Sequence, residues 1–314
     1  MTMQPQADKL LLIGATGQVG RSLLPFLRKK FQVAVLMRPK TYASNPKKVK
    51  ELEAEDIAIR QGDLDDEDSL VNALEGISVV VSSVAIASLL SQLILIKAMK
   101  KVGHIKRFVP SDFGIDVRNH TDDVPSFKEK VQVHQALFDS GIPYTIIDTG
   151  PWMELTAKGF GGPLNPDFEL VPQDIRLWGS GDTVLTMGFL DDNSRLCAEA
   201  IADDRTLNKR VMVDVNVTTA NQLIETWVRL GGPRPRVGPP VTEDEVVQLI
   251  SHVTDPYMNF GLRIMHNGHF HDGFKRPDDY LSTSELYPEV TKACTTVEQH
   301  YAKILTDLKQ STAT

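Results

Sequence analysis

Three glycines spaced three residues apart follow a short apolar run near the start of the chain. The run is Leu10–Ile13, and the pattern predicts a buried strand, a tight turn and the start of a helix. Such a turn offers backbone N–H groups to a phosphate, which approaches closely because glycine has no Cβ. We therefore predict a dinucleotide pyrophosphate here, contacted by Gly14, Thr16, Gly17, Gln18, Val19 and Gly20. A packing turn without ligand is the alternative, because G-x-x-G-x-x-G is looser than the usual G-x-G-x-x-G fingerprint.

An arginine stands where the second expected strand, Gln32–Met37, ends. In dinucleotide-binding folds an acidic residue near this position binds the ribose 2′-hydroxyl of NAD, whereas an arginine accommodates the 2′-phosphate of NADP. Arg38, helped by Lys47 or Lys48 on the following loop, therefore argues for NADP(H). A solvated strand-end charge is the alternative. Asp63 has two interpretations, a contact with the adenine end or a turn and cap residue.

Strands and helices must alternate to position these groups. We expect strands at 57–60 and 77–81, a strand within 107–114 that leads into a loop, and a helix stop and strand within 141–147. Helices are expected at 21–30, 68–74, 89–102 and 122–140, with a further helix ending at 51–55. This order predicts an α/β fold with a Rossmann-like, doubly wound parallel sheet. Ser83 and Val84 fall at the carboxyl end of a strand, where open parallel sheets place their ligands.

The sequence becomes richer in glycine and proline after Gly150. We expect residues 1–150 to form an NADP(H)-binding Rossmann domain and residues 151–314 to form mainly a smaller C-terminal α/β substrate domain. Segments near 190–230, with helices at Arg195–Ala202 and Thr219–Leu230, are expected to return to the first domain. Six glycines and prolines make the start of the second domain loop-rich: Gly159, Gly161, Gly162, Pro163, Pro166 and Pro172.

Composition excludes several classes of function. The net charge of −7 and the absence of a long basic run argue against a nucleic-acid partner. Cys197 and Cys294 lie far apart and fit reduced thiols, so we expect a cytoplasmic protein. The polar first nine residues do not resemble a signal peptide. Residues 77–96 carry no charge, but their serines and their change of pattern predict a strand and then a helix, not a membrane span.

The block Arg107–Gly114, with Pro-Ser-Asp-Phe-Gly at its end, stands 16 residues before Lys130. Together with the glycine turn, Arg38 and the later blocks Arg205–Lys209 and Ser284–Pro288, it makes the chain resemble the isoflavone reductase-like, or NmrA-like, branch of the atypical short-chain dehydrogenases. That branch includes pinoresinol-lariciresinol and phenylcoumaran benzylic ether reductases. The resemblance runs nearly end to end.

The resemblance implies an NADPH-dependent reductase of a small aromatic secondary metabolite. Hydride would pass to an enone, quinone-methide-like or benzylic carbon, with Lys130 as general acid/base and cofactor contact. It further implies Arg38 and Lys48 as 2′-phosphate ligands, and Ser83 with Val84 along the cofactor. The substrate is implied to contact Phe113, His134, Trp152, His266 and His269. A homodimer is left open.

Helical spacing, apart from the resemblance, favours Lys130 over Lys128 as the lysine that faces the cleft. Lys130 shares a helix face with Phe127 and His134, whereas Lys128 is turned about 200° away. Acid/base work near neutrality requires a lysine pKa lowered from about 10.4. The tyrosine that ordinary short-chain dehydrogenases place four residues before the lysine is missing, since position 126 is serine. A solvated helix lysine is the alternative.

Three positions depart from the plant pattern near the nicotinamide or the substrate. The family often has Arg at His134, Asn at Gly150 and Gly at Ala85, so the plant substrates are not carried over. The residues from Gly150 to Glu154 resemble a fungal-type variant. Within them, Trp152 either lines an aromatic pocket or belongs to the core.

Three histidines within six residues, His266, His269 and His271, invite a metal hypothesis. We expect no metal, because the i, i+3, i+5 spacing is poor for ligands and the stretch offers no partner carboxylate. His266 or His269 donating to a substrate oxygen is the functional alternative to surface histidines.

Two other functions remain open. An NmrA-like regulator would bind NADP(H) as a redox signal without turnover, although regulators of this branch generally lack the lysine at position 130. A dehydratase or cyclase-like member would use the cofactor only structurally.

Overall fold

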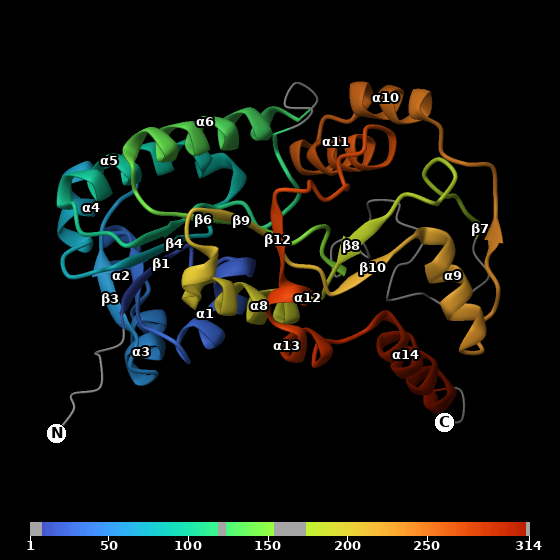
Figure 1. Cartoon of the computed structure of the whole chain (residues 1–314), viewed down its shortest axis with the longest axis horizontal. Coiled ribbons are helices and arrows are strands. Elements are labelled where there is room, and N and C mark those ends of the chain that lie inside the picture. The colour runs from blue at the N-terminus through green and yellow to red at the C-terminus, as the bar shows by residue number, and fades with distance from the viewer. Residues whose placement is uncertain (1–7, 119–123, 154–173, 312–314) are drawn as a thin grey trace. The chain divides into compact units, whose positions relative to one another are not determined.

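Five parallel strands organise the N-terminal part of the chain in a computed structural model that describes residues 8–118, 124–153 and 174–311 (Figure 1). Their order is β3-β2-β1-β4-β5, and Leu11 of β1 pairs with Ala34 of β2 and Val80 of β4. This confirms the Rossmann-like, doubly wound parallel sheet. The strands are β1 (Lys9–Ile13), β2 (Gln32–Met37), β3 (Ala58–Gln61), β4 (Val79–Ser82) and β5 (Arg107–Val109).

The sheet continues past β5. Phe108 bridges in parallel to Tyr144 and donates its N–H to the carbonyl oxygen of Pro143 at 2.8 Å. Tyr144 leads into β6 (Thr145–Asp148), which has β9 (Lys209–Met212) as a neighbour. A segment more than 60 residues further along the chain therefore joins the edge of the first sheet.

Helices cover both faces of this sheet because alternate strand residues point to opposite sides. Leu11 and Ile13 pack with apolar residues of α4 (Glu67–Ala73), α5 (Gln92–Val102) and α6 (Pro125–Ser140). Val35 and Met37 pack on the other face with residues of α1 (Gln18–Leu27) and α3 (Pro46–Ala54). Figure 1 shows the two helical layers on either side of the strands.

The expected loop after Arg38 is wrong, because two short helices occupy it. These are α2 (Pro39–Ser44) and α3, each with proline at its first position, where the missing N–H costs nothing. Asn45 caps α3 by accepting a hydrogen bond from the Lys48 N–H at 3.1 Å, so Lys48 stands on a helix.

The uncharged segment 77–96 is a strand followed by helical structure, as predicted. It contains β4, the 3₁₀ helix η1 (Ile86–Ser91) and the start of α5. Within the described residues, no helix has both the length and the apolar character needed to span a membrane.

Arg107 fastens a late segment of the chain to the first sheet. Its guanidinium is buried, and Nη1 donates to the Thr206 hydroxyl at 2.9 Å and to the Ala200 carbonyl at 3.0 Å. Nη2 donates to the Asp203 carbonyl at 2.9 Å. These acceptors lie on α8 (Leu190–Ala202) and η2 (Asp204–Thr206) or directly between them. Residues 194–211 are thereby held against β5.

The chain forms two compact units. The first contains residues 1–113, 126–147 and 194–211, and the second contains residues 114–125, 148–193 and 212–314. The helix expected at Thr219–Leu230 is α9 (Ala220–Arg229) and lies in the second unit. Assignment of cofactor and substrate to separate units stays a prediction. The loop-rich stretch from Gly159 to Pro172 lies outside the described residues.

Short sheets and helices build the second unit. β8 (Leu185–Met187) pairs antiparallel with β10 (Asn216–Thr218), and β7 (Asp174–Ile175) pairs in parallel with β11 (Arg236–Val237). Two helix pairs pack together, α9 with α14 and α10 with α11. The remaining elements are α10 (Glu243–His252), α11 (Pro256–Phe270), β12 (Tyr280–Ser282), α12 (Thr283–Leu286), α13 (Pro288–Lys292) and α14 (Val297–Ser311).

Candidate functional site

The turn after β1 has no room for side chains at two of its glycines. Gly14 has a φ of +80°, and a Cβ there would lie 2.4 Å from the backbone oxygen of Ser83. A Cβ on Gly20 would lie 2.2 Å from the backbone oxygen of Gly14. Gly17 is the N-cap of α1, and no side chain of the described residues caps that end. The first N–H groups of α1 are therefore available to an anion.

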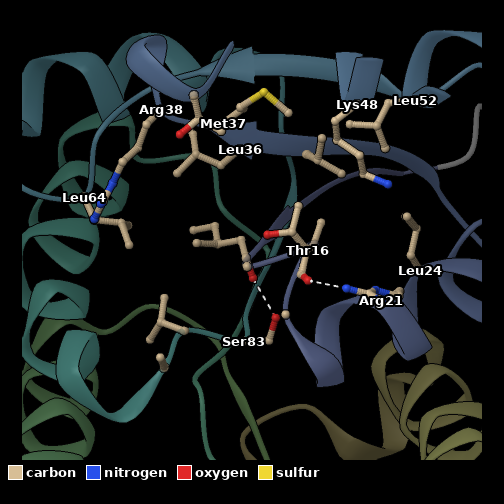
Figure 2. A pocket seen from close by; sticks show the side chains of 18 of the residues that line it. Thr16, Arg21, Leu24, Leu36, Met37, Arg38, Lys48, Leu52, Leu64 and Ser83 are labelled. Atoms are coloured by element: carbon tan, nitrogen blue, oxygen red, sulfur yellow. Dashed lines mark hydrogen bonds between the residues drawn. The ribbon is translucent and has the colours of Figure 1, made fainter. Parts of the chain in front are cut away.

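A cavity of about 520 Å³ opens beside this turn (Figure 2). It lies where β1 and β4 are neighbours, and at this point the strand order of the sheet reverses direction, which is where open α/β sheets bind ligands. Ser83 fixes the two strand ends together, since its N–H and its hydroxyl donate to the Ile13 carbonyl at 2.9 and 2.8 Å. The size suits a small molecule or cofactor.

Seven of the predicted cofactor residues line this cavity: Gly14, Thr16, Gly17, Arg38, Lys48, Ser83 and Val84. Gln18, Val19 and Gly20 form the first turn of α1, and Lys130 lies on α6. The carboxylate of Asp63 accepts the Asp65 N–H at 3.2 Å, which fits its interpretation as a turn residue. The adenine contact of Asp63 stays a prediction.

Cations dominate the charged lining. Arg21, Arg28, Arg38 and Lys48 line the cavity, with Glu55 as the acidic residue among the lining groups. The Arg38 Nε lies 3.6 Å from Asp63, and the Lys48 Nζ lies 3.3 Å from a carboxylate oxygen of Glu51, in half-exposed pairs. Figure 2 shows Arg38 and Lys48 extending along different sides of the cavity. The excess positive charge favours an anionic ligand, and a joint contact of both residues with one phosphate stays a prediction.

A short chain of bonds connects the cavity wall to Lys130. Val84 lines the cavity, and its carbonyl accepts the Ser111 hydroxyl at 3.0 Å. The next residue, Asp112, offers its backbone oxygen to the Lys130 Nζ at 2.8 Å. Because an ammonium has three N–H donors, this bond leaves two for other acceptors.

Lys130 stands on the inward side of α6, as the helical spacing predicted. It is half-buried and its helix neighbours Phe127 and His134 are 2% and 3% exposed, whereas Lys128 is exposed. Phe113 is also buried and has a φ of +39°, a left-handed conformation that is strained for a bulky side chain. The roles of Lys130, His134 and Phe113 in catalysis or substrate binding stay predictions.

Asp112 holds His134 through its carboxylate. The His134 Nε2 lies 2.9 and 3.1 Å from the two carboxylate oxygens, and the Arg210 Nη2 lies 3.4 Å from the His134 Nδ1. Burial by itself would raise the pKa of Asp112, but the charges of His134, Lys130 and Arg210 and the His134 hydrogen bond together lower the pKa below its ordinary value. Asp112 is therefore a buried carboxylate whose side chain and backbone oxygen hold two residues of α6.

The other predicted substrate residues belong to the second unit. Trp152 is half-buried, and its indole N–H donates to the Thr149 hydroxyl at 2.7 Å. His269 stacks on Trp178 with a centroid distance of 5.7 Å, and Phe274 meets it edge-on at 5.3 Å. His269 is therefore held in an aromatic stack. Contacts of these residues with a substrate stay predictions.

His266 has a carboxylate partner that was not predicted from the sequence. Its Nε2 lies 3.2 Å from a carboxylate oxygen of Glu243. The expectation that these histidines have no partner carboxylate is wrong, because the packing of α10 against α11 supplies one from 23 residues away. Nothing local in the sequence indicated this pairing.

Comparison with known proteins gives the family. The NmrA-like family model matches residues 6–301. The chain belongs to the NmrA-like family. It is 32% identical to a phenylcoumaran benzylic ether reductase of Ginkgo biloba, over 93% of this chain and 97% of that protein. It is also 32% identical to an isoflavone reductase homolog of Solanum tuberosum, over 90% and 94% of the two chains.

A solved structure extends the likeness from sequence to fold. The binary complex of leucoanthocyanidin reductase with NADPH from Vitis vinifera has a TM-score of 0.78 and 26% identity, and the match covers 95% of this chain and 100% of that one. This NmrA-like chain therefore shares its fold with an NADPH-bound reductase.

Four residues that line the cavity or contact predicted site residues were not predicted as site residues themselves: Arg21, Asp112, Arg210 and Glu243. Asp112 lies inside the quoted block and four positions of α6 separate Lys130 from His134, so both signals were present. Arg21 stands one helical turn after Gly17 and donates to the Thr16 carbonyl at 3.1 Å. Arg210 and Glu243 carried no local signal, because the fold alone brings them to His134 and His266.

Acidification should destabilise the fold through His269. Burial lowers the pKa of His269 from its ordinary value of about 6.5 to about 4. Between these pH values the unfolded chain binds a proton at His269 and the folded chain does not. The stability of the folded chain is therefore full above pH 6.5, and this contribution is lost progressively as the pH falls from 6.5 to 4. Between pH 7 and pH 5 the free energy of unfolding should fall by about 2 kcal/mol more in the wild type than in His269→Phe.

Urea unfolding at the two pH values measures this difference. His252→Gln is the control, because His252 is exposed at the end of α10 and its replacement should leave the pH dependence of the wild type. Equal losses in the wild type and in His269→Phe would refute the assignment.

Proposed function

We propose that this protein is an NADPH-dependent reductase of a small aromatic secondary metabolite, which receives hydride at an enone, quinone-methide-like or benzylic carbon. The observation that carries the proposal is the glycine turn at the uncapped start of α1, beside a cavity whose charged lining residues are mainly cations. The chain's relatives named as isoflavone and phenylcoumaran benzylic ether reductases support the choice of reaction and substrate class.

The residues present fit the cofactor. Because Gly14 and Gly20 carry no Cβ, the turn packs closely against Ser83, and the first N–H groups of α1, which no side chain caps, are left for a pyrophosphate. Arg38 follows β2 directly and lines the cavity, where an arginine accommodates the 2′-phosphate. When bound, NADPH supplies the hydride. The protein's own contribution is binding, orientation and a proton.

Lys130 is the proton donor in this proposal. Its Nζ is held by the Asp112 carbonyl, with two further N–H donors available for a substrate oxygen as negative charge develops there. Asp112 and His134 are positioning residues, because their mutual bond fixes the backbone that holds the Nζ. A lysine held in this way does the task for which ordinary short-chain dehydrogenases use a tyrosine.

Consumption of NADPH with a panel of enones, quinone-methide precursors and benzylic ethers tests this function. We expect one class to be reduced, with a product two hydrogens richer by mass spectrometry. NADH should be used less well, and Arg38→Ala should weaken NADPH use by about 10- to 100-fold because it removes a charged contact worth about 1.5–3 kcal/mol, with little effect on NADH.

The matched control is Arg60→Ala, because Arg60 lies on β3, donates to the Glu75 carbonyl at 3.2 Å and is not itself a lining residue. Saturable NADPH binding without turnover of any class would favour a regulatory, cofactor-sensing protein instead. Equal use of both cofactors by the wild type would contradict the role of Arg38.

A further inference from the structure

Two histidines and a glutamate converge in the second unit, outside the cavity described above. The Glu243 carboxylate lies 2.9 Å from the His271 Nε2 and 3.2 Å from the His266 Nε2. One ligand atom from each residue lies within 4.8 Å of the others. His266 is buried, His271 is half-buried and Glu243 is exposed, so the group is both anchored and open to solvent.

Local structure sets each of these three side chains. Thr242 and Glu245 form a capping box that fixes the start of α10 and places Glu243 in its first turn. His266 lies near the end of α11, and His271 follows directly as its C-cap with non-helical backbone. The break in the helix brings two residues five positions apart to a ring-centroid distance of 4.8 Å. The poor helical spacing of the histidines is thus overcome at the helix end.

The chemistry of this donor set suits a transition metal. Two imidazole nitrogens and one carboxylate oxygen are suitable ligands for Zn²⁺ and other divalent first-row transition metals, with zinc-to-ligand distances of about 2.0–2.2 Å. Bonds of that length around a tetrahedral ion place ligand atoms about 3.3 Å apart. The carboxylate-to-imidazole distances of 2.9 and 3.2 Å are already close to this value. The widest separation among the three ligand atoms, up to 4.8 Å, must shorten when an ion is received.

We propose that Glu243, His266 and His271 bind one divalent transition-metal ion, with Zn²⁺ as the best fit, and that the ion fastens the start of α10 to the end of α11. A fourth position faces solvent through the exposed Glu243 side. The ion would cross-link two helices that already pack against each other. This site is independent of the proposed reductase function.

Cobalt binding tests the site directly. Full-length protein freed of metal with a chelator is titrated with Co²⁺, whose visible absorption reports tetrahedral coordination. We expect one ion per chain, displacement by Zn²⁺, and a rise in Tm of about 5 °C at Zn²⁺ concentrations near 100 times Kd. Reductase activity plays no part in these readouts, so failure of the proposed function would not affect them.

Three variants separate this site from incidental binding. His271→Ala and Glu243→Gln change accessible side chains and should weaken Co²⁺ binding at least about 10-fold, by loss of a ligand. His252→Ala, at the exposed end of α10, should bind Co²⁺ as the wild type does. Absence of saturable binding below about 1 mM, or equal binding by His271→Ala and the wild type, would overturn the proposal.

Discussion

Replacing Lys130 by alanine should lower kcat by about 10²- to 10⁴-fold on any substrate that the wild type reduces, the usual contribution of a positioned general acid. The reason is that the Nζ held at 2.8 Å from the Asp112 carbonyl is the proposed proton source. The KM for NADPH should change far less than kcat, because the lining of the cofactor cavity is left intact. Steady-state kinetics and fluorescence titration with NADPH measure the two effects.

Lys128→Ala is the matched control for this prediction. Lys128 lies on the same helix two positions away and is exposed, so its loss should leave kcat near the wild-type value. Turnover by Lys130→Ala within a few-fold of the wild type would show that the acid lies elsewhere. A thermal melt of both variants distinguishes lost chemistry from lost fold.

Arg107→Met should lower the free energy of unfolding by about 3 kcal/mol, because a buried side chain loses its charge-assisted hydrogen bonds. Three of these bonds reach Thr206, Ala200 and Asp203 at 2.9 to 3.0 Å, and a fourth reaches the Thr145 hydroxyl at 3.3 Å. Methionine fills a similar volume but offers no donor to these oxygens. Denaturant unfolding, followed by circular dichroism, should show an earlier midpoint.

Arg234→Met is the comparison for this stability effect. Arg234 forms an exposed ion pair with Glu225 at 2.8 Å, and exposed pairs of this kind contribute little, so its unfolding midpoint should stay near that of the wild type. If Arg107→Met unfolds at the wild-type midpoint, the network does not hold residues 194–211 in place. Limited proteolysis near Asp203 and Asp204 gives an independent readout.

Local signals predicted the features that local physics determines. A glycine turn between an apolar strand and a helix, and alternating strands and helices, required no knowledge of distant residues, and both were found. The helix expected to end at 51–55 is α3, but its start before Lys48 is not predicted although Asn45 and Pro46 indicate it, because the segment is interpreted by its charge. Glu243 could not have been predicted, since helix packing and not sequence spacing brings it to His266.

In the candidate site, too, some positions could be predicted from the sequence and others could not. Val84 and Ser83 could be placed at the cavity because the carboxyl ends of parallel strands share one edge of the sheet. The link from Val84 through Ser111 to Asp112 depends on side-chain rotamers and a loop path. Residue types alone do not determine these. The same is true of Arg210, which reaches His134 from 76 residues away.

The partner of Lys130 is a main-chain oxygen, and this shapes how the site can evolve. Any residue at position 112 supplies the same carbonyl, provided that the backbone follows the same path. A substitution at this position would therefore remove the carboxylate that contacts His134, and it would affect the hydrogen bond of Lys130 only through the backbone path. A substitution at position 112 that keeps this backbone path therefore changes the charge beside the ammonium while its main-chain acceptor stays in place.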